Sequence, residues 1–434
     1  MDSFNGNINE SISKMALIKR KSVAIIGSGI SGIVSAYSLY KQFNVILFES
    51  ESQLGGHTFS MPVSDPNLGQ INIDMGFIVF NLINYPLFAK FLKDLNVNYQ
   101  DSDMSFGFYD KQKDFFYNSD FPNGTFSKRR HFFSVKFWRF LNEIRLFNKH
   151  VMNDLNTNQL GSFTVLEYLS RLPFSNLLIN AYVLPMGAAI WSCPKEQIND
   201  FPAAPFFKFW KNHHLLTLGN RPVWKTVQGG SQSYINAFKK IFNGEIRLNE
   251  KVTKIIREPN KVKILTNKKQ SVEVDFVIVA THADQALTMI HQPSNIESDL
   301  LGAWKYSKNS VCLHTDQSSM PPKRNVWSSW LVNQSSDDLL EMNYYMNRLQ
   351  NLQSSVDYFV SLNNNSNINS GKKIMTKFFT HPIFNAASIK TQSQLNELNT
   401  GPLFFCGSYF GNGFHEDGVR SAIQAVNQLN KTYD

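Results

Sequence analysis

The first folded stretch of the chain alternates apolar and polar positions in the pattern of a strand, a helix and a second strand. Residues 21–26 (KSVAII) are a short apolar run rich in β-branched side chains. Residues 31–43 carry apolar side chains at helical spacing, and residues 44–49 (NVILFE) form a second apolar run that ends in an acid. The pattern predicts a βαβ unit of about 30 residues.

Two other periodicities divide the rest of the chain. Residues 85–97, 136–155 and 163–172 place apolar side chains three and four positions apart, which predicts helices. Residues 71–80 (INIDMGFIVF) favour a single strand, and five short alternating segments between 310 and 381 favour an antiparallel sheet. We therefore expect an α+β region beside the βαβ unit.

Composition narrows the class of protein. With 434 residues, of which 42% are hydrophobic and 18% charged, the chain is globular and long enough for two or three domains. No apolar run reaches the about 20 residues that a membrane-spanning helix needs, and residues 1–20 are expected to be a loose polar tail. Cys193, Cys312 and Cys406 form no C-x-x-C pair, so a reducing compartment, the cytoplasm, fits best.

The net charge of +9 has three readings: a lysine-rich solvated surface, an anionic membrane or a nucleic acid. No zinc-finger or RNA-binding signature is present, so we expect no nucleic-acid partner. His213 and His214 lack acidic or cysteine partners at ligand spacing, so we also expect no metal.

The glycines of IIGSGISG carry the first candidate chemistry. Gly27 permits a tight turn, Gly29 lets the backbone approach a pyrophosphate, and Gly32 lets a helix pack on the strand. Ile30 and Ser31 open that helix, whose N-terminal N–H groups and dipole attract phosphate. With a strand before it and a helix after it, this G-x-G-x-x-G predicts a dinucleotide site.

An acid and a second glycine pair follow at the spacing that such a site requires. Glu49 stands where a carboxylate would accept hydrogen bonds from the adenosine ribose, and Ser50 follows it. The turn Gly55-Gly56-His57-Thr58 again lets backbone come close to a large ligand. Residues 403–426 predict a strand, a glycine-rich loop and a helix, which suit the electron-rich edge of a flavin.

These three segments together resemble one known group of proteins. GSGISG, ESESQLGGHT and CGSYFGNGFHEDGVRSA resemble the FAD-dependent amine oxidase superfamily, which also holds carotenoid desaturases and protoporphyrinogen oxidases. More narrowly, DMGFIVFN, LPMGAAIWSCP and RPVWKTVQGGSQSY resemble a bacterial subgroup of predicted NAD/FAD-binding proteins. The same segments resemble the flavoprotein-like N-terminal region of plant cyclopropane fatty acid synthases.

The resemblance implies the fold and its division. It predicts an α/β protein with a Rossmann-like, glutathione-reductase-like FAD-binding domain split over residues 21–81, 221–290 and 401–434. Residues 82–220 and 291–400 would form an α+β substrate domain of the amine oxidase type.

The resemblance also implies cofactor contacts. FAD is expected to bind non-covalently: some relatives attach it through a cysteine, but no cysteine stands at the matching place. Cys406 falls near the flavin by the same mapping, and we expect it to be a small buried strand residue. Relatives often carry an acid where this chain has Ser408. Further contacts are expected from the backbone at Val252, the strand end at Ala280 and the C-terminal loop and helix start, at Gly407, Ser408, Gly418 and Val419.

Two residues of the C-terminal loop are candidate catalytic residues. Tyr409 would face the substrate, unless it packs in the core, and His415 would transfer a proton, unless it and its acidic neighbours cap the helix. Four aromatic residues are candidates for the substrate cavity or for the core: Trp191, Trp224, Tyr344 and Tyr345.

The leading hypothesis for function is an FAD-dependent oxidoreductase that transfers a hydride between the flavin and a lipid-like, fatty-acyl substrate. Two alternatives stay open: a flavin amine oxidase that acts on a small molecule, and an FAD-binding accessory protein of a lipid-modifying methyltransferase.

Residues 126–149 carry a further hypothesis. Lys128, Arg129 and Arg130 lie among Phe and Trp residues, as in segments that bind peripherally to an anionic membrane. Residues 206–211 (FFKFWK) repeat this composition. The alternative is an ordinary domain helix with buried aromatics and solvated cations.

Overall fold

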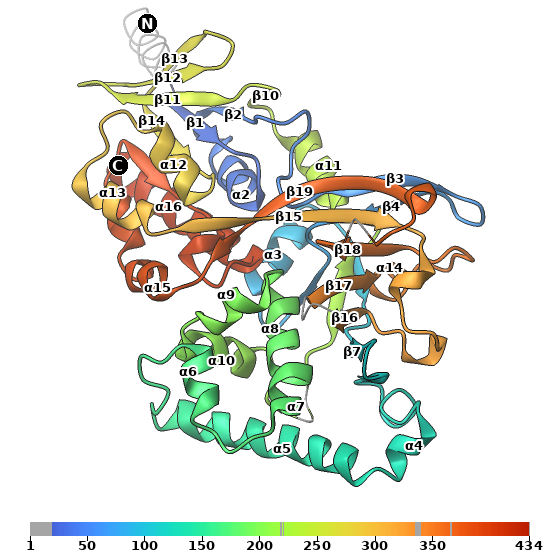
Figure 1. Ribbon diagram of the computed structural model, residues 1–434. Coiled ribbons are helices and arrows are strands. Elements are labelled where there is room, and N and C mark those ends of the chain that lie inside the picture. The colour runs from blue at the N-terminus through green and yellow to red at the C-terminus, as the bar shows by residue number, and fades with distance from the viewer. Residues whose placement is uncertain (1–19, 218, 220, 335–339, 365–366, 434) are drawn as a thin grey trace, which may run out of the picture.

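The computed structural model describes residues 20–433 except 218, 220, 335–339 and 365–366. The tail expected at residues 1–20 therefore lies outside the described residues but for Arg20. Figure 1 shows three parts: a sheet around β1 and β2 with its helices, a second sheet that contains the long strands β15 and β19, and a helical lobe.

A five-stranded parallel sheet draws its strands from distant parts of the chain. Its order is β10-β2-β1-β14-β20, with β1 and β2 flanking the predicted crossover helix. The bounds are β1 Ser22–Ile26, β2 Asn44–Phe48, β10 Glu245–Arg247, β14 Phe276–Val279 and β20 Leu403–Phe405. Its central strands are almost wholly buried, as expected of a parallel sheet covered on both faces.

Helices and an antiparallel meander cover this sheet. Helix α2 packs against α16, the last helix, and the meander β11-β12-β13 lies at the other side (Figure 1). The bounds are α2 Ile30–Leu39, α11 Gln232–Ile241, α12 Ala283–Met289, α16 His415–Tyr433, β11 Val252–Arg257, β12 Val262–Thr266 and β13 Ser271–Val274.

The second sheet has seven strands in the order β19-β15-β18-β17-β16-β7-β8, antiparallel except for β16 with β7. It contains the predicted antiparallel segments and adds a hairpin, β7-β8, that the sequence pattern did not indicate. The bounds are β7 Phe106–Asp110, β8 Phe115–Asn118, β15 Lys305–His314, β16 Trp330–Gln334, β17 Leu340–Tyr345, β18 Phe359–Leu362 and β19 Lys373–Ile383.

Residues 71–80 form two strands in place of the single strand expected. The chain leaves β4 and passes close to the backbone of His57: a Cβ on Gly76 would lie 2.1 Å from the His57 carbonyl oxygen. Phe77 donates its N–H to that oxygen at 2.9 Å. The small sheets hold β3 Ser60–Asp65 with β4 Gly69–Asp74, and β5 Val79–Asn81 with β6 Tyr99–Asp101 and β9 Trp224–Val227.

The helical lobe is built around α5, the long helix at the bottom of Figure 1. The side chain of Ser134 caps α5 by accepting a hydrogen bond from the Phe137 N–H. The bounds in this region are α3 Pro86–Asp94, α4 Arg129–Phe132, α5 Val135–Asn156, α6 Val165–Ser170, α7 Asn176–Leu178, α8 Leu184–Trp191, α9 Lys195–Asn199 and α10 Ala203–Asn212; those of the later helices are α13 Asn295–Gly302, α14 Met346–Leu349 and α15 Ala386–Gln392.

Candidate functional site

The first glycine turn brings the end of β1 against the start of α2. Gly27 has φ of +95°, and a Cβ there would lie 2.9 Å from the carbonyl oxygen of Ala280. A Cβ on Gly32 would lie 1.9 Å from the carbonyl oxygen of Gly27. The turn therefore closes only with glycine at both positions. At Gly29 no atom lies within 4 Å of the Cβ position, so the backbone there faces open space.

That open space is one end of a cavity of about 740 Å³. Gly29, Ile30 and Ser31 line it together. The first N–H groups of a helix have no partner within the helix, and the helix dipole places partial positive charge at this end. This end of the cavity therefore has the donors and the charge that the phosphates of a dinucleotide require.

The second glycine turn borders the first. Gly55 and Gly56 have φ of +129° and +58°, and a Cβ on Gly56 would lie 3.1 Å from the Gly29 Cα. The Gly55 N–H donates to the Ser28 carbonyl oxygen at 3.1 Å. The two turns thus form one continuous wall of backbone, as the sequence predicted for the approach of a large ligand.

Glu49 holds the first glycine turn from the end of β2. One carboxylate oxygen accepts hydrogen bonds from the Ser28 N–H at 3.0 Å and the Ser28 hydroxyl at 2.5 Å. The other accepts from the Glu51 N–H at 2.9 Å and the Ser50 hydroxyl at 3.2 Å. A ribose hydroxyl would therefore compete with the two serine hydroxyls for this carboxylate.

Most of the residues predicted to bind the cofactor line this one cavity, although they come from distant parts of the sequence: Gly27, Gly29, Ile30, Ser31, Glu49, Ser50, Gly55, Gly56, His57, Ala280, Gly407 and Ser408. The predicted catalytic residues Tyr409 and His415 line it too.

The other residues predicted to bind the cofactor do not line the cavity but pack behind its lining: Gly32, Thr58, Val252, Gly418 and Val419. The Gly418 N–H was expected to face the flavin. It donates instead to the Phe414 carbonyl oxygen at 3.1 Å, so it is not available to a ligand. A Cβ on Gly418 would lie 2.8 Å from the Ile30 side chain, and the Ser31 hydroxyl donates to the Gly418 carbonyl oxygen. Gly418 therefore lets α16 pack against α2, and Val419 beside it is buried.

Val252 is buried at the start of β11 and does not line the cavity. The loop just before it does reach the site, because the Glu250 N–H donates to the Glu49 carbonyl oxygen at 2.9 Å. Gly32 and Thr58 are likewise buried supports of the cavity wall.

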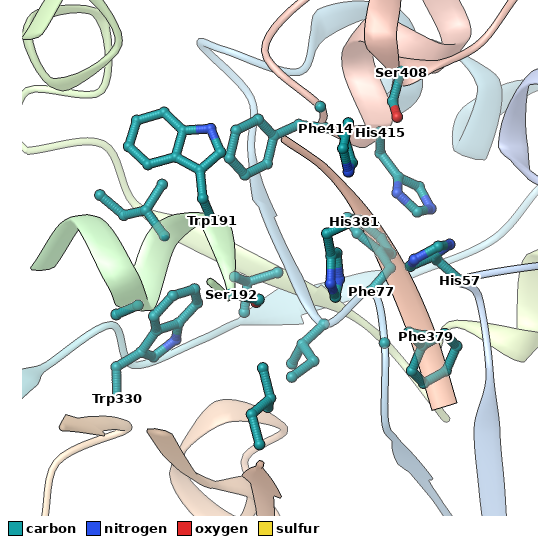
Figure 2. Close-up of a pocket in the computed structure, with 18 of the residues that line it drawn as sticks. His57, Phe77, Trp191, Ser192, Trp330, Phe379, His381, Ser408, Phe414 and His415 are labelled. Atoms are coloured by element: carbon teal, nitrogen blue, oxygen red, sulfur yellow. The ribbon is translucent and has the colours of Figure 1, made fainter. Parts of the chain in front are cut away.

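His415 is fixed in its place by neighbours from three separate segments of the chain. Its Nε2 lies 3.2 Å from the Thr58 hydroxyl and 3.3 Å from the Tyr234 hydroxyl, which are themselves hydrogen-bonded to each other. Its ring stacks on Phe77 with 3.5 Å between the centroids (Figure 2). Burial lowers the pKa of His415 well below its usual value, and His57 lowers it further. His415 is therefore a neutral, weakly basic group at pH 7.

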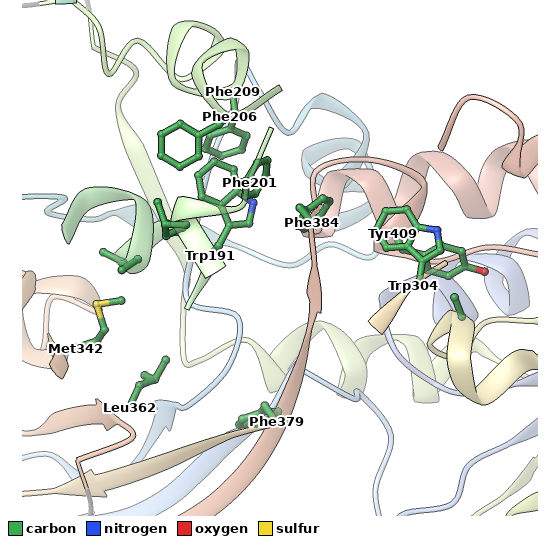
Figure 3. Close-up of a cluster of buried hydrophobic side chains, with 14 of the residues drawn as sticks. Trp191, Phe201, Phe206, Phe209, Trp304, Met342, Leu362, Phe379, Phe384 and Tyr409 are labelled. Atoms are coloured by element: carbon green, nitrogen blue, oxygen red, sulfur yellow. The ribbon is translucent and has the colours of Figure 1, made fainter. Parts of the chain in front are cut away.

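Tyr409 lines the cavity, but its hydroxyl is not a usable acid at neutral pH. The hydroxyl is buried without a hydrogen-bond partner in the described structure, and burial raises its pKa well above the usual value. The ring lies 5.7 Å from Trp304 (Figure 3). Asp417, nearby, accepts hydrogen bonds from the Asn412 and Phe414 N–H groups, so it fastens the loop as a capping residue would.

Three further histidines form a wall with His415: His57, which the sequence predicted at the cofactor site, and His282 and His381, which it did not single out. His57 lies 5.2 Å from His381 and 6.0 Å from His282, ring centre to ring centre. Burial, followed by the neighbouring imidazoles, lowers the pKa of His57 and His282 to about 4 and that of His381 to about 3. Among the described residues, no group of three or more His, Cys, Asp or Glu side chains could hold a metal ion.

An aromatic wall stands opposite the histidines. Trp191 stacks on Phe206 at 5.0 Å and lies 6.3 Å from Phe414 (Figures 2 and 3). Trp224 and Tyr344 also line the cavity, as anticipated. Tyr345 does not, because its hydroxyl donates to Asp357 at 2.6 Å in a separate apolar cluster.

Several lining residues escaped the sequence analysis because tertiary contacts alone bring them here: Phe77, His282, Tyr306, Trp330, Phe379 and His381. His282 had a usable signal, since it directly follows a strand end already expected near the cofactor. Phe379 and His381 had none, because strand alternation does not tell which face of β19 meets the cavity.

These features fit FAD on the chain's own geometry. The backbone at Gly29 is open where Gly27 and Gly32 are crowded, a helix N-terminus faces the opening, and a carboxylate stands at the end of β2. The fold and the site together define a dinucleotide-dependent oxidoreductase.

Comparison with known proteins gives the family. Residues 30–356 match the model of the flavin containing amine oxidoreductases, so the chain belongs to this family and uses FAD as its cofactor. Achacin of Lissachatina fulica is 30% identical over 86 residues, which are 20% of this chain and 16% of achacin.

Solved structures share the fold. Putrescine oxidase bound to putrescine has a TM-score of 0.68 at 11% identity over 95% of this chain and 99% of its own. Cyclohexylamine oxidase from Brevibacterium oxydans IH-35A scores 0.68 at 12% identity, over 96% and 100%. The fatty acid isomerase of P. acnes scores 0.63 at 13%, also over 96% and 100%. The predicted amine oxidase-like α/β fold is confirmed.

The open backbone at Gly29 gives a sharp test of the cofactor site. We expect the purified wild-type protein to be yellow and to release free FAD on acid treatment. Gly29→Val should fold but purify colourless, because its side chain would fill the space that the pyrophosphate needs. The ratio of flavin absorbance to protein, with circular dichroism as the check on folding, measures this.

Gly32→Ala is the matched control. A Cβ at this position would lie 1.9 Å from the Gly27 carbonyl oxygen. This variant should therefore have a lower melting temperature than the wild type, whereas Gly29→Val should not. A Gly29→Val protein that keeps a full complement of FAD would contradict the assignment of this turn.

The histidine wall predicts how stability depends on pH. Because the folded pKa values of His57, His282 and His381 lie below the value of 6.5 for an unfolded chain, the unfolded state binds more protons. Stability should be full above about pH 6.5 and fall as the pH drops toward 4. Burial raises the pKa of Asp74 to about 7, which acts in the opposite direction, but the histidines outnumber it.

Thermal unfolding at pH 7.5 and pH 5.0 measures this dependence. The variant His282→Gln with His381→Gln should show a smaller loss of melting temperature between the two values. An unchanged loss would mean that these imidazoles are not buried in the neutral state.

Proposed function

We propose that this flavin-dependent oxidoreductase acts on a lipid-like substrate, a fatty-acyl chain. When bound, FAD supplies a two-electron acceptor or donor for hydride transfer. The observation that carries the proposal is the cavity between the histidine wall and α5, whose lining there is largely apolar and includes Met104, Phe106, Leu141, Ile144, Met186, Ile190, Val311 and Leu362. The resemblance to the N-terminal region of plant cyclopropane fatty acid synthases supports the same substrate class.

The charges on the cavity wall also support a lipid over a cation. Among the described lining residues, Glu49 is the single carboxylate, and it belongs to the glycine turns. The lining histidines are neutral at pH 7. An ammonium group in the substrate region would therefore find no opposite charge, whereas a hydrocarbon chain gains from each apolar surface it buries.

We propose roles for the predicted site residues within this scheme. The glycine turns, the start of α2 and Glu49 hold FAD, and Gly407 and Ser408 border its reactive part. Tyr409 provides an aromatic surface. His415 is held by Thr58 and Tyr234 and remains the candidate for proton transfer. Because its lowered pKa makes it a weak base, we expect it at neutral pH to position the reacting groups.

The arrangement of strands supports the expected division of the chain. The five-stranded sheet takes β1 and β2 from residues 21–81, β10 and β14 from 221–290, and β20 from 401–434. We infer that these segments form the FAD-binding domain and that residues 82–220 and 291–400 form the substrate domain. None of the three cysteines lines the cavity, which supports non-covalent binding of FAD.

Amine oxidation is the second candidate, and the aromatic wall favours it. Trp191, Phe414, Trp330 and Tyr344 could bind an amine against their ring faces. The third candidate, an accessory flavoprotein of a lipid-modifying methyltransferase, would use the same FAD site without turnover.

Anaerobic mixing separates the three. We expect an acyl lipid to bleach the visible flavin band of the oxidised enzyme, or to restore it in photoreduced enzyme if the reaction runs toward reduction. A polyamine or cyclohexylamine should do neither. Bleaching by an amine alone would favour amine oxidation, and a flavin that neither class of compound changes would favour the accessory role.

We also propose that the protein is cytoplasmic and contacts an anionic membrane peripherally, at the N-terminal end of α5. Large side chains are exposed here: Phe121, Phe132, Phe133, Val135 and Trp138, which we call the α5 aromatic patch. Phe133 and Val135 are 83% and 84% exposed. A contiguous exposed apolar patch of this kind is typical of an interaction site. Within the described part of the chain, no helix has the length and apolar character to cross a bilayer.

The structure changes which cations belong to this surface. Lys128, expected in the basic cluster, is buried, pairs with Asp114 and lies over the Phe116 ring. Arg129 and Lys136 are exposed beside the patch. The second segment, residues 206–211, provides no exposed aromatic surface, because Phe206, Phe207, Phe209 and Trp210 are buried.

Liposome co-sedimentation tests this surface. The wild-type protein should sediment with anionic vesicles, less so as salt rises, and Phe133→Ser with Val135→Ser should lower binding roughly tenfold or more because two apolar anchors are lost. Phe378→Ser, which removes an exposed aromatic on β19 outside the patch, should bind as wild type does. Wild-type protein that stays in the supernatant at low salt would refute membrane contact.

A further inference from the structure

The end of the cavity beside α5 differs from the rest of the wall in being polar and positively charged. It is lined by Asn118, Arg145, Asn148, Tyr182 and Arg221, which we call the α5 polar cluster. Helix α5 lies far from α2 in Figure 1, so this cluster and the glycine turns line different ends of the cavity. Aliphatic lining residues of α5 and α8 border it.

Two members of the cluster, Asn148 and Arg221, approach Tyr182, and Arg145 lies beside Asn148 on α5. Arg145 and Asn148 are three residues apart on α5 and therefore share a face of the helix. The Tyr182 hydroxyl donates to the Asn148 side-chain oxygen at 3.4 Å. Burial raises the pKa of Tyr182, while the Asn148 hydrogen bond and the nearby charge of Arg221 oppose that rise. Arg221 thus reaches the same place from a different part of the chain.

The two arginines carry charge that the protein does not neutralise. In the described structure neither Arg145 nor Arg221 has a carboxylate within ion-pair distance, and Arg145 donates only to the neutral side chain of Asn142, at 3.1 and 3.3 Å. Glu143, two positions before Arg145, is held by Arg139 and Ser175. Both arginines are exposed at the cavity mouth, so their charge costs little in the absence of a ligand.

Asn118, which lines the same cavity from β8, has a hydrogen-bond donor that the described structure leaves unsatisfied. The residue is fully buried, and its side-chain oxygen accepts a hydrogen bond from the Asp120 N–H at 2.9 Å. Its side-chain NH₂ group has no hydrogen-bond partner. A buried donor without a partner is costly, and a ligand oxygen would relieve that cost.

We propose that the α5 polar cluster binds the anionic headgroup of an acyl substrate, with Arg145 and Arg221 as charge partners and Asn118 and Asn148 as neutral hydrogen-bonding groups. The ligand is a carboxylate or phosphate monoanion attached to a hydrocarbon chain. With the head held here, the chain runs past Leu141, Ile144, Met186 and Ile190 toward the histidine wall. This inference rests on the proposed function and names the polar end of its substrate.

Binding to the FAD-loaded oxidised enzyme tests the proposal without requiring turnover. The probes are decanoate, decanol and decylamine, which share one chain and differ in the head. The readout is the perturbation of the flavin absorbance during titration. Decanoate should bind about tenfold or more tightly than decanol, because a charge-assisted hydrogen bond contributes about 1.5–3 kcal/mol, and decylamine should bind most weakly.

Substitutions then locate the effect. Arg145→Gln and Arg221→Gln should each weaken decanoate about tenfold and leave decanol unchanged. Lys149→Gln, which removes the same charge from an exposed position of α5 outside the cavity lining, should leave both unchanged. Thermal unfolding checks that each variant is folded.

Equal affinity for decanoate and decanol, or equal losses in the arginine and Lys149 variants, would overturn the proposal. If decanoate binds as expected but no acyl compound alters the flavin redox state, the proposed function fails and the headgroup site stands. Vesicles of phosphatidylglycerol and of phosphatidylcholine identify the source: a perturbation by the first alone that depends on Arg145 assigns the head to a phospholipid, and its absence assigns it to a free carboxylate.

Discussion

The close approach of backbone to backbone around the first glycine turn is the constraint on which the site depends. The carbonyl oxygens of Gly27 and Ala280 occupy the space that a Cβ at Gly32 or at Gly27 would need. This contact fixes α2 against the ends of β1 and β14. It also aims the start of α2 at the cavity, and Gly418 continues the same logic by letting α16 lie on α2. A methyl group at any of these positions would separate the elements that form this end of the cavity.

A second consequence concerns charge. One wall of the cavity is built from imidazoles that burial keeps neutral, so a ligand there would meet polarisable rings and few fixed charges. Such a wall neither attracts nor repels an ion strongly. Under the proposed function, discrimination between substrates by charge would fall to the far end of the cavity, where Arg145 and Arg221 lie.

The sequence predicted those parts of the molecule that local rules determine. The βαβ unit and the glycine turns were predictable because strand length, helix spacing and turn chemistry are all encoded within about 30 residues. The split of residues 71–80 was not, because only the tertiary contact between Gly76 and the His57 backbone breaks the strand. The pairing of Lys128 with Asp114 was hidden for the same reason, since a basic run looks alike whether its members are buried or solvated.

The histidine wall shows the same limit for the candidate functional site, because the sequence did not predict that its members lie together. His57, His282 and His381 are separated by more than 90 residues from one another, and only the register of β19 against β15 and the end of β14 bring them together.

The placement of the charged groups in the cavity also bears on substrate choice. A cationic amine entering past Arg145 and Arg221 would meet repulsion of about 1 kcal/mol from each charge at 4 Å even in water, and more where water is excluded. The relatives named for amines share this fold at 11% and 12% identity, a level at which the fold persists while the charges that select a substrate are free to differ.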